Sequence, residues 1–122
     1  MKRVLSVGQC VPDQAAIERL LNANFEVTVQ KAATADEALA AVQDGGVDLV
    51  LVNRKLDADY SDGSEIIQSL KDDPATADVP VMLITNYAEH DEAAVKMGAV
   101  SGFGKASLGE PETTAKLAEF LS

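Results

Sequence analysis

The chain has little of several residue types that define particular classes of protein. It contains one cysteine, Cys10, and no tryptophan among its 122 residues. A single cysteine cannot form an internal disulfide, which excludes the disulfide-stabilised secreted scaffolds and is compatible with a reducing compartment. Basic residues are also scarce, because ten Lys and Arg face twenty Asp and Glu and give a formal net charge of −10. Nucleic acids and anionic membranes repel such a chain, so neither is expected as a direct partner.

Long apolar segments are missing as well. The opening residues, MKRVLSVGQCVPDQ, contain too short an apolar run for a signal peptide. No segment approaches the length of a membrane span. A chain of 122 residues has the size of one compact domain. We therefore expect a single cytoplasmic domain over residues 1–122.

The sequence does contain an alternation of short apolar runs with stretches of helical period. The run VDLVLV, residues 47–52, is the most continuous and is typical of a strand buried on both faces of a parallel sheet. Strands are predicted at residues 4–7, 25–29, 47–52, 79–85 and 100–104, and helices at 11–24, 34–44, 62–71, 89–97 and 111–122. Five strands alternating with five helices predict a three-layer, doubly wound α/β fold.

Two of the predicted helices begin with capping signals. Thr34 and Glu37, in the stretch TADE, form the pattern of a capping box, in which the hydroxyl and the carboxylate satisfy the first free amides of the helix. Asp62 is suited to cap the third helix through its carboxylate. These signals indicate where the loops after the strands end.

A binding site in a doubly wound sheet lies beyond the carboxyl ends of the strands, near the switch in strand order. The residues at those ends are Gly8, Gln9 and Cys10; Asn53; Thr85 and Asn86; and Gly104 and Lys105. We therefore look for functional side chains among these residues.

The chain resembles the receiver domains of two-component response regulators over nearly its whole length. The resemblance depends on the KRVLSVG strand, on DLVLVN followed by a loop ending in DG, on VPVMLIT ending at Thr85, on the pair Gly98 and Ala99, and on Lys105 after the fifth strand. It implies a flavodoxin-like (βα)5 sheet with strand order 2-1-3-4-5. It also implies phosphorelay chemistry, in which an aspartate ending the third strand accepts a phosphoryl group from a histidine kinase. An acidic pair after the first strand would help that aspartate to hold Mg²⁺.

The residues that would perform this chemistry are only partly present. Thr85 and Lys105 stand where the resemblance places the hydroxyl and the ammonium that engage the phosphoryl oxygens. The position of the phosphoacceptor, however, is Asn53, and the acidic pair falls on Gly8 and Gln9. An amide cannot form an acyl phosphate, and Mg²⁺ prefers anionic oxygen ligands. We therefore expect no catalytic residue, no cofactor, and weak or absent magnesium binding.

The positions that transmit the signal in receivers are altered as well. The aromatic position of the fifth strand falls on Gly102, with Phe103 beside it, and the position of the proline after the lysine is Ala106. The loop between Asn53 and the DG turn is longer than the family pattern. The resemblance therefore predicts that every step of the phosphorylation switch is affected.

Three other acids are candidates for a displaced acceptor. Asp57 and Asp59 lie in the lengthened loop, and Asp13 lies near the start of the first helix. The competing interpretation is that they are solvated loop acids, because active geometry tolerates little misplacement. For Lys105 we predict a hydrogen bond to the side-chain oxygen of Asn53 or a bridge to Asp57 or Asp59. Extension into solvent is the alternative.

Cysteine and histidine each occur once. Cys10 is expected to be a buried or half-buried thiol with no histidine nearby to act as a base. His90 is expected to lie exposed just past the fourth strand. Neither residue is predicted to be a nucleophile.

We interpret the chain as an atypical receiver that acts in signal transduction as a phosphorylation-independent protein-interaction module, not as an enzyme. One alternative is a phosphorylatable receiver that uses Asp57 or Asp59 with phosphate from a histidine kinase. A weaker alternative is a flavodoxin-like binder of a small ligand. The expected partner is a protein, and a homodimer through the fourth helix, fifth strand and fifth helix stays open. The candidate contacts on that face are Ala94, Val95, Met97, Phe103, Leu117 and Phe120.

Overall fold

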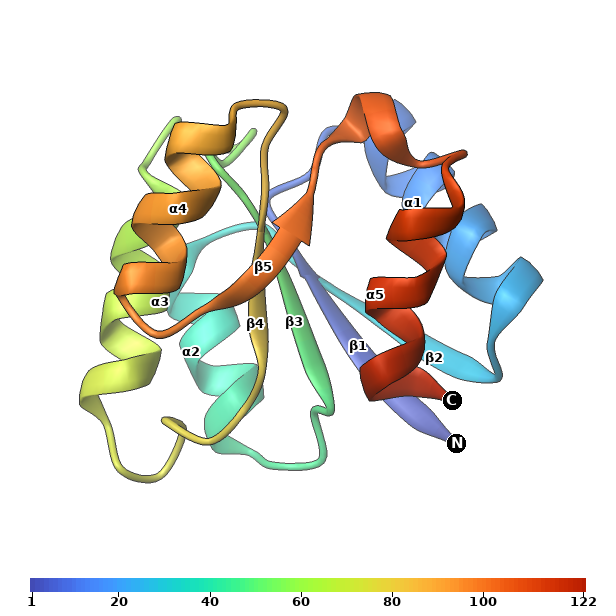
Figure 1. Ribbon diagram of the computed structural model, residues 1–122. Helices are drawn as coiled ribbons and strands as arrows, with labels where there is room; N and C mark the ends of the chain where they lie inside the picture. The colour runs from blue at the N-terminus through green and yellow to red at the C-terminus, as the bar shows by residue number, and fades with distance from the viewer.

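A parallel five-stranded sheet forms the centre of the molecule (Figure 1). The computed structural model describes all residues from 1 to 122. The strands are β1 (Lys2–Val7), β2 (Val27–Ala32), β3 (Leu49–Asn53), β4 (Val81–Ile84) and β5 (Val100–Phe103). The helices are α1 (Val11–Asn24), α2 (Ala35–Gln43), α3 (Gly63–Asp72), α4 (Ala88–Lys96) and α5 (Pro111–Leu121), with a short 3₁₀ helix, η1 (Lys105–Ser107). The strand order is β2-β1-β3-β4-β5, so the predicted fold is confirmed.

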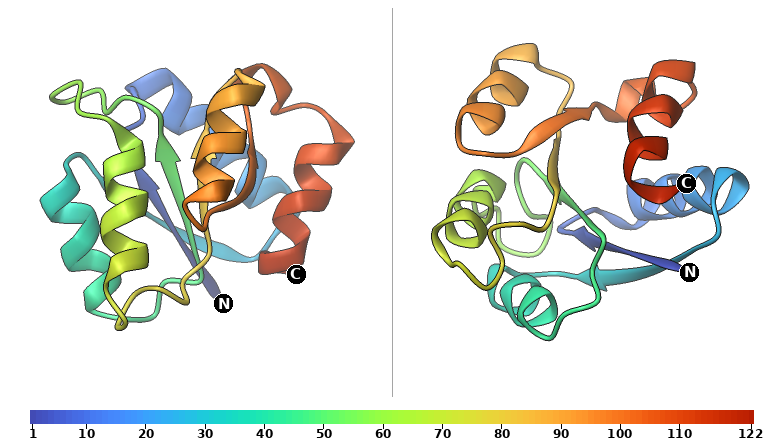
Figure 2. Two further views of the ribbon diagram at one scale, coloured as in Figure 1. Left: turned by 60° about the vertical axis from the view of Figure 1, so that its left-hand side comes forward. Right: turned by 60° about the horizontal axis from the view of Figure 1, so that its bottom comes forward.

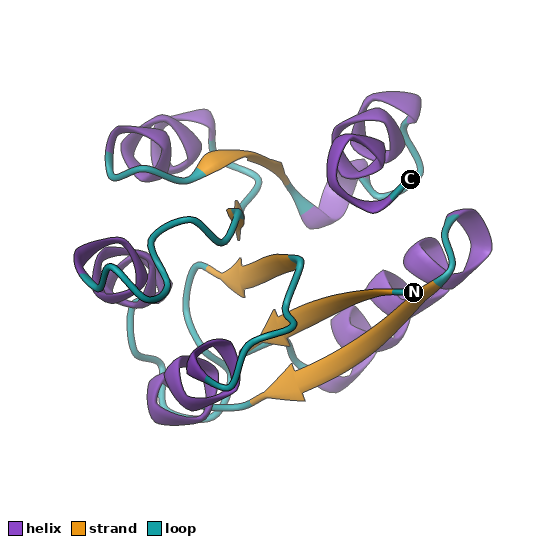
Figure 3. Ribbon diagram, turned by 90° about the horizontal axis from the view of Figure 1, so that it is seen from below, coloured by secondary structure: helices purple, strands orange, loops and turns teal.

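Helices cover both faces of the sheet. Figure 2 and Figure 3 show α1 and α5 on one face and α2, α3 and α4 on the other. Because all strands run parallel, their carboxyl ends meet at one edge, which is the upper edge in Figure 1. None of the helices combines the length and the apolar character needed to cross a lipid bilayer.

An apolar core on each face holds the layers together. Along β1, Val4 belongs to the core under α1 and α5, whereas Leu5 and Val7 belong to the core under α2, α3 and α4. The strands β3 and β4 alternate in the same way, so both are buried on both faces, as the run VDLVLV predicted. The loops at the carboxyl edge are therefore mounted on a closely packed frame.

The second strand begins later than the sequence pattern predicted. A strand was expected at residues 25–29, but β2 spans Val27–Ala32. The backbone N–H of Phe25 donates to the carbonyl of Leu21, so Phe25 caps the end of α1 instead of joining the sheet. The strand extends further at its other end, because Ala32 pairs with Val7 at the end of β1.

Both predicted helix caps are present. The Thr34 side chain accepts from the Glu37 N–H at 3.3 Å, and the Glu37 carboxylate accepts from the Thr34 N–H at 3.0 Å. The Asp62 carboxylate accepts from the Ser64 N–H at 2.9 Å at the start of α3. These bonds satisfy amides that the first turn of a helix leaves free.

Candidate functional site

Three of the expected site residues lie together at the carboxyl edge of the sheet. Asn53 is the last residue of β3, Thr85 directly follows β4, and Lys105 begins η1 after β5. These residues border a cavity of about 160 Å³, whose lining is Asn53, Arg54, Ile84, Thr85, Asn86, Tyr87 and Lys105. The parallel sheet thus brings these three residues to one place, as expected.

Gly8 lies at the same edge, but a residue of the β3–α3 loop occupies the space beside it. Leu56 is fully buried and belongs to the core under α2, α3 and α4. A Cβ atom on Gly8 would lie 2.3 Å from Leu56 Cδ2 and 2.9 Å from Leu56 Cα. Gly8 also has a φ of +74°, a conformation that favours glycine. The position of the first acidic residue therefore has no room for a side chain.

The Gln9 side chain does not line the cavity at Asn53. Its Nε2 donates to the Val7 carbonyl at 3.4 Å, and the residue borders a separate cavity with Gln14 and Lys31. Its buried Oε1 atom has no hydrogen-bond donor. The structure therefore brings the backbone of Gly8 to Asn53 but directs the Gln9 side chain to a different cavity.

Asn53 connects the β1–α1 loop to the β3–α3 loop. Its Nδ2 atom donates to the Gly8 carbonyl at 3.2 Å and to the Lys55 carbonyl at 2.8 Å. The backbone amide of Asp57 donates to the same Gly8 carbonyl at 2.9 Å. The oxygens of an ionised aspartate only accept hydrogen bonds. At position 53 such a side chain would have no hydrogen to donate to these two carbonyl oxygens and would be repelled by them. The amide therefore suits this junction better than a carboxylate would.

The residues at this edge do not fit a magnesium ion. Mg²⁺ is usually bound through one or two carboxylates in a near-octahedral arrangement of oxygens. Gly8 supplies no side chain, and Asn53 is neutral and directs its Nδ2 atom to backbone carbonyls. No group of three or more His, Cys, Asp or Glu side chains is placed to hold a metal ion. The polar groups at this edge instead hold the β1–α1 loop and the β3–α3 loop together.

The β3–α3 loop closes on itself. Lys55 and Asp62 form an antiparallel bridge, and the Leu56 N–H donates to the Ser61 carbonyl at 3.0 Å. Asp59 accepts from the hydroxyl and the N–H of Ser61, and these bonds hold the pKa of Asp59 below its ordinary value. The pKa of Asp62 is lowered as well, chiefly by its bond to the Ser64 hydroxyl. Two acids of this loop therefore stabilise its shape.

Lys105 pairs with a residue of α1. Its Nζ atom lies 2.6 Å from Asp13 Oδ2. The predicted bond to Asn53 is therefore wrong, and so are a bridge to Asp57 or Asp59 and extension into solvent. The first turn of α1 brings a carboxylate to Lys105, and an ammonium bonds a carboxylate more strongly than a neutral amide.

Cys10 belongs to the same polar cluster at the start of α1. Its Sγ atom lies 3.0 Å from Asp13 Oδ2, the oxygen that also meets the ammonium of Lys105. The bond from the Cys10 thiol and, after it, the bond from Lys105 lower the pKa of Asp13. Cys10 is a half-buried free thiol, as predicted.

The Asp13 carboxyl is expected to titrate below its ordinary pKa of 3.8. Because the folded state has the lower pKa, the carboxylate stabilises the fold above pH 3.8, and this contribution is lost as the pH falls through the folded pKa. An NMR titration of the side-chain carboxyl carbons measures the pKa. The variant Lys105→Gln should raise it, whereas Lys96→Gln in α4 should leave it unchanged. An Asp13 pKa that does not respond to Lys105→Gln would contradict the ion pair.

Thr85 is held by neighbours in the β4–α4 loop. Its Oγ1 atom accepts from the Tyr87 N–H at 3.2 Å and lies 3.3 Å from His90 Nδ1. His90 is half-buried in the first turn of α4, and its ring meets the Tyr87 ring edge-on at a centroid distance of 5.3 Å. The prediction that His90 lies exposed past the fourth strand is wrong, because this first turn folds back onto Thr85.

The fifth strand has no room for an aromatic side chain at Gly102. A Cβ atom there would lie 2.4 Å from the carbonyl oxygen of Leu83 in β4. The adjacent Phe103 is only 6% exposed and packs in the core under α1 and α5. Phe103 is therefore a core residue and not a substitute for the missing aromatic.

Polar side chains from two helices close the outer edge of β5. Asp91 of α4 accepts from the Gly102 N–H and from the Ser101 hydroxyl, both at 2.8 Å. Lys116 of α5 donates to the Gly102 carbonyl at 2.9 Å. These bonds satisfy groups that an edge strand leaves unpaired, and they fasten α4, β5 and α5 to one another.

Half of the candidate contact residues on the face formed by α4, β5 and α5 are buried and cannot contact a partner. Three candidates are at most 6% exposed and belong to the cores, namely Ala94, Phe103 and Leu117. Met97 and Phe120 are half-buried against the same cores, so Val95 is the one candidate that is exposed, at 42%. Helical period identifies an apolar face, but it cannot tell whether the sheet or a partner covers that face.

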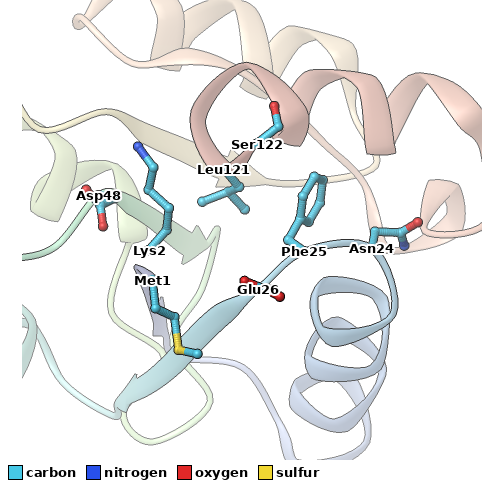
Figure 4. Close-up of a pocket in the computed structure, with 8 residues that line it drawn as sticks. All are labelled: Met1, Lys2, Asn24, Phe25, Glu26, Asp48, Leu121 and Ser122. Atoms are coloured by element: carbon cyan, nitrogen blue, oxygen red, sulfur yellow. The ribbon is translucent and has the colours of Figure 1, made fainter.

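The largest cavity lies at the opposite edge of the sheet, where the two termini meet (Figure 4). It has a volume of about 580 Å³, and its lining is Met1, Lys2, Asn24, Phe25, Glu26, Asp48, Leu121 and Ser122. None of the expected site residues borders it, so we do not assign the site there.

Leu56 is the site residue that the sequence reasoning missed. It is a single leucine in an otherwise largely polar loop, and such an isolated apolar residue is the one local sign that the loop folds inward. Asn86, named among the strand ends, has a structural role: its Oδ1 accepts from the Ala106 N–H at 3.0 Å. This bond joins the β4–α4 loop to the segment that follows β5.

The fold is a doubly wound α/β domain with a cavity at the carboxyl ends of its strands. Residues 10–111 match the family described as the response regulator receiver domain, and the chain belongs to this family. It is a receiver domain of the kind that operates in two-component signalling. No match was found among curated protein sequences.

Solved receiver structures share the fold. The signal receiver domain of the DNA-binding response regulator protein merR from Colwellia psychrerythraea 34H has a TM-score of 0.81 at 20% identity, covering 98% of this chain and 97% of that one. The chemotaxis response regulator CheY4 of Vibrio cholerae gives 0.73 at 21%, with 98% and 97% covered. The receiver domain of NtrX from Brucella abortus gives 0.74 at 24%, with 95% and 94% covered.

Proposed function

We propose that this receiver domain acts in two-component signalling as a phosphorylation-independent protein-interaction module. The observation that carries the proposal is the junction of Gly8, Asn53 and Leu56. The residue at the acceptor position is an amide bonded to backbone carbonyls, and Leu56 occupies the space of the first acidic side chain. Phosphoryl transfer to a receiver needs a nucleophilic carboxylate and a cation held beside it, and this edge supplies neither. The domain catalyses no reaction of its own and binds its partner through a fixed surface.

The other acids offer little support for a displaced acceptor. The Asp59 carboxylate is bonded to Ser61, and the Asp13 carboxylate is bonded to Lys105. Asp57 is exposed, and its backbone is fixed by the bond to the Gly8 carbonyl. None of the three acids lines the cavity at the end of β3.

A small-ligand function is not favoured by the size of the site. The cavity at Asn53 has a volume of about 160 Å³. Pockets for small molecules and cofactors usually have volumes of roughly 300–1,000 Å³. We therefore propose a protein as the partner. We also propose that magnesium binding is weak or absent and that the domain is cytoplasmic.

Incubation with acetyl phosphate and Mg²⁺, read by intact-mass spectrometry, tests the proposal. We expect no gain of a phosphate, because no carboxylate stands at the acceptor position. A receiver that carries an aspartate at this position is treated in parallel and should gain one phosphate.

A gain of one phosphate by this chain would overturn the proposal. The variants Asp13→Asn, Asp57→Asn and Asp59→Asn would then show which acid accepts the group. Loss of labelling in one variant and not in the other two would identify the displaced acceptor.

A further inference from the structure

Three of the five large apolar or aromatic side chains that are exposed lie at the carboxyl edge of the sheet. Val11 is 84% exposed at the start of α1, Tyr60 is 76% exposed in the β3–α3 loop, and Tyr87 is 62% exposed before α4. The loops that carry them all leave the sheet at the upper edge in Figure 1. We propose that this tyrosine edge, Val11, Tyr60 and Tyr87, is a docking surface for a basic protein partner. The inference rests on the proposed function and names the surface through which it acts.

Both tyrosines of the chain belong to this surface. The chain has only five aromatic residues, three Phe and two Tyr, and no Trp. All three phenylalanines pack in or against the core under α1 and α5, whereas both tyrosines extend into solvent. Isolated exposed apolar residues are ordinary in proteins, but tyrosine is enriched at interfaces, where its large ring is buried by a partner. Two exposed tyrosines and a valine on one edge therefore indicate a contact surface.

Tyr60 is held outward by an uncommon backbone conformation. Its φ of 58° is the one positive value in the chain outside glycine. The left-handed region is unfavourable for a bulky side chain, and such strain is concentrated at functional sites. The N–H of Tyr60 donates to the Leu56 carbonyl at 2.8 Å, which fixes the turn. Glycine would fit this turn better, so the stability of the loop does not explain the tyrosine.

Exposed acids lie close in the chain to both tyrosines, and they indicate the charge of the partner. Asp57 and Asp59 flank Tyr60, and Glu89 lies in the first turn of α4. In the same loop Lys55 is exposed and Arg54 is half-buried, and Lys105 at this edge is already paired with Asp13, so these cations offset only part of the charge of the three acids. With a net charge of −10, the chain repels a second copy and attracts a basic surface. The partner that fits this surface is a protein with apolar pockets that bind the two tyrosine rings and with Lys and Arg side chains around those pockets.

The face formed by α4, β5 and α5 supplies the internal comparison. Val95 is its one strongly exposed apolar candidate, at 42%. A photo-crosslinking amino acid placed in the full chain at position 60, 87 or 95, in the cells that produce it, tests the two faces against each other. We expect crosslinks from positions 60 and 87 to one protein of basic surface, and none to that protein from position 95.

The crosslinked protein is then purified and titrated against the full chain by calorimetry. We expect Tyr60→Gly and Tyr87→Ser each to weaken binding at least tenfold, while Val95→Ser leaves the affinity unchanged. Tyr60→Gly should also raise the melting temperature, because glycine relieves the backbone strain. A structural role for Tyr60 would instead predict that stability and binding fall together.

Several outcomes would overturn this surface. These are crosslinks from position 95 alone, crosslinks to a second copy of the chain or to an acidic protein, no crosslink at all, or unchanged binding by the tyrosine variants. Crosslinking from position 95 alone would leave the proposed interaction module standing and move its surface to α4, β5 and α5. Phosphate gain from acetyl phosphate is a separate result, and it would count against the proposed function itself.

Discussion

Gly8→Asp is expected to destabilise the domain by about 3 kcal/mol and to create no magnesium site. The new Cβ atom would lie 2.3 Å from Leu56 Cδ2 and 2.9 Å from Leu56 Cα, at a φ of +74°. Leu56 cannot move aside without loss of packing, because it is fully buried and its backbone closes the β3–α3 loop. Urea denaturation measures the loss. Calorimetric titration with Mg²⁺ checks the triple variant Gly8→Asp, Gln9→Asp, Asn53→Asp for metal binding.

Gly45→Asp is the matched control for this experiment. Gly45 has a similar φ of +85°, but nothing lies within 4 Å of the position of its Cβ atom. Its loss of stability therefore reports the backbone conformation alone, and the excess loss at Gly8 reports the overlap with Leu56. Measured against Leu56→Ala alone, which removes a fully buried side chain and is itself destabilising, Gly8→Asp should cost less than it does beside Leu56, since Leu56 Cδ2 is removed and Leu56 Cα stays. Equal losses at Gly8 and Gly45, or magnesium binding by the triple variant, would contradict the overlap.

The elements that local patterns determine were predicted well from the sequence. The apolar period of α1 and Pro12 near its start predicted the helix at residues 11–24, and the structure has it at Val11–Asn24. β3 and β4 followed from unbroken apolar runs, because a strand buried on both faces needs apolar side chains on both sides. β2 was placed too early, since whether Phe25 ends the helix or begins the strand is decided by its backbone bond to Leu21.

The sequence predicted which residues of the candidate site lie at the same edge of the sheet, but not which side chains contact one another there. Parallel strands bring Asn53, Thr85 and Lys105 to one edge whatever their side chains do, and this placement holds. The pairing of Lys105 with Asp13 depends on how the first turn of α1 faces the segment after β5, and no local pattern encodes that orientation. The inward path of Leu56 is likewise set by contact with a residue far away in the chain.

Gly102→Ala is expected to destabilise the fold by about 2–3 kcal/mol, although it adds a single methyl group. That carbon would lie 2.4 Å from the carbonyl oxygen of Leu83, a backbone atom of β4 that no rotamer change can move. β5 would have to shift away from β4. This shift would strain the bond from the backbone N–H at position 102 to Asp91 and the bond from Lys116 to the carbonyl at position 102. Chemical denaturation gives the loss of stability, and hydrogen exchange of the backbone amide at position 102 shows whether the bond to Asp91 is kept.

Gly109→Ala provides the comparison, because nothing lies within 4 Å of the position of its Cβ atom and its backbone is not left-handed. It should be neutral or stabilising by up to about 1 kcal/mol, since alanine restricts the unfolded chain. A large loss at Gly102 with none at Gly109 would mean that an aromatic cannot be restored in β5 without parting the two strands. That result would also mean that the bonds of Asp91 and Lys116 hold the face of α4, β5 and α5 in one conformation, and that no aromatic side chain in β5 can change its position to transmit a signal. If Gly102→Tyr folds with unchanged stability, β5 moves freely against β4 and the fixed face is contradicted.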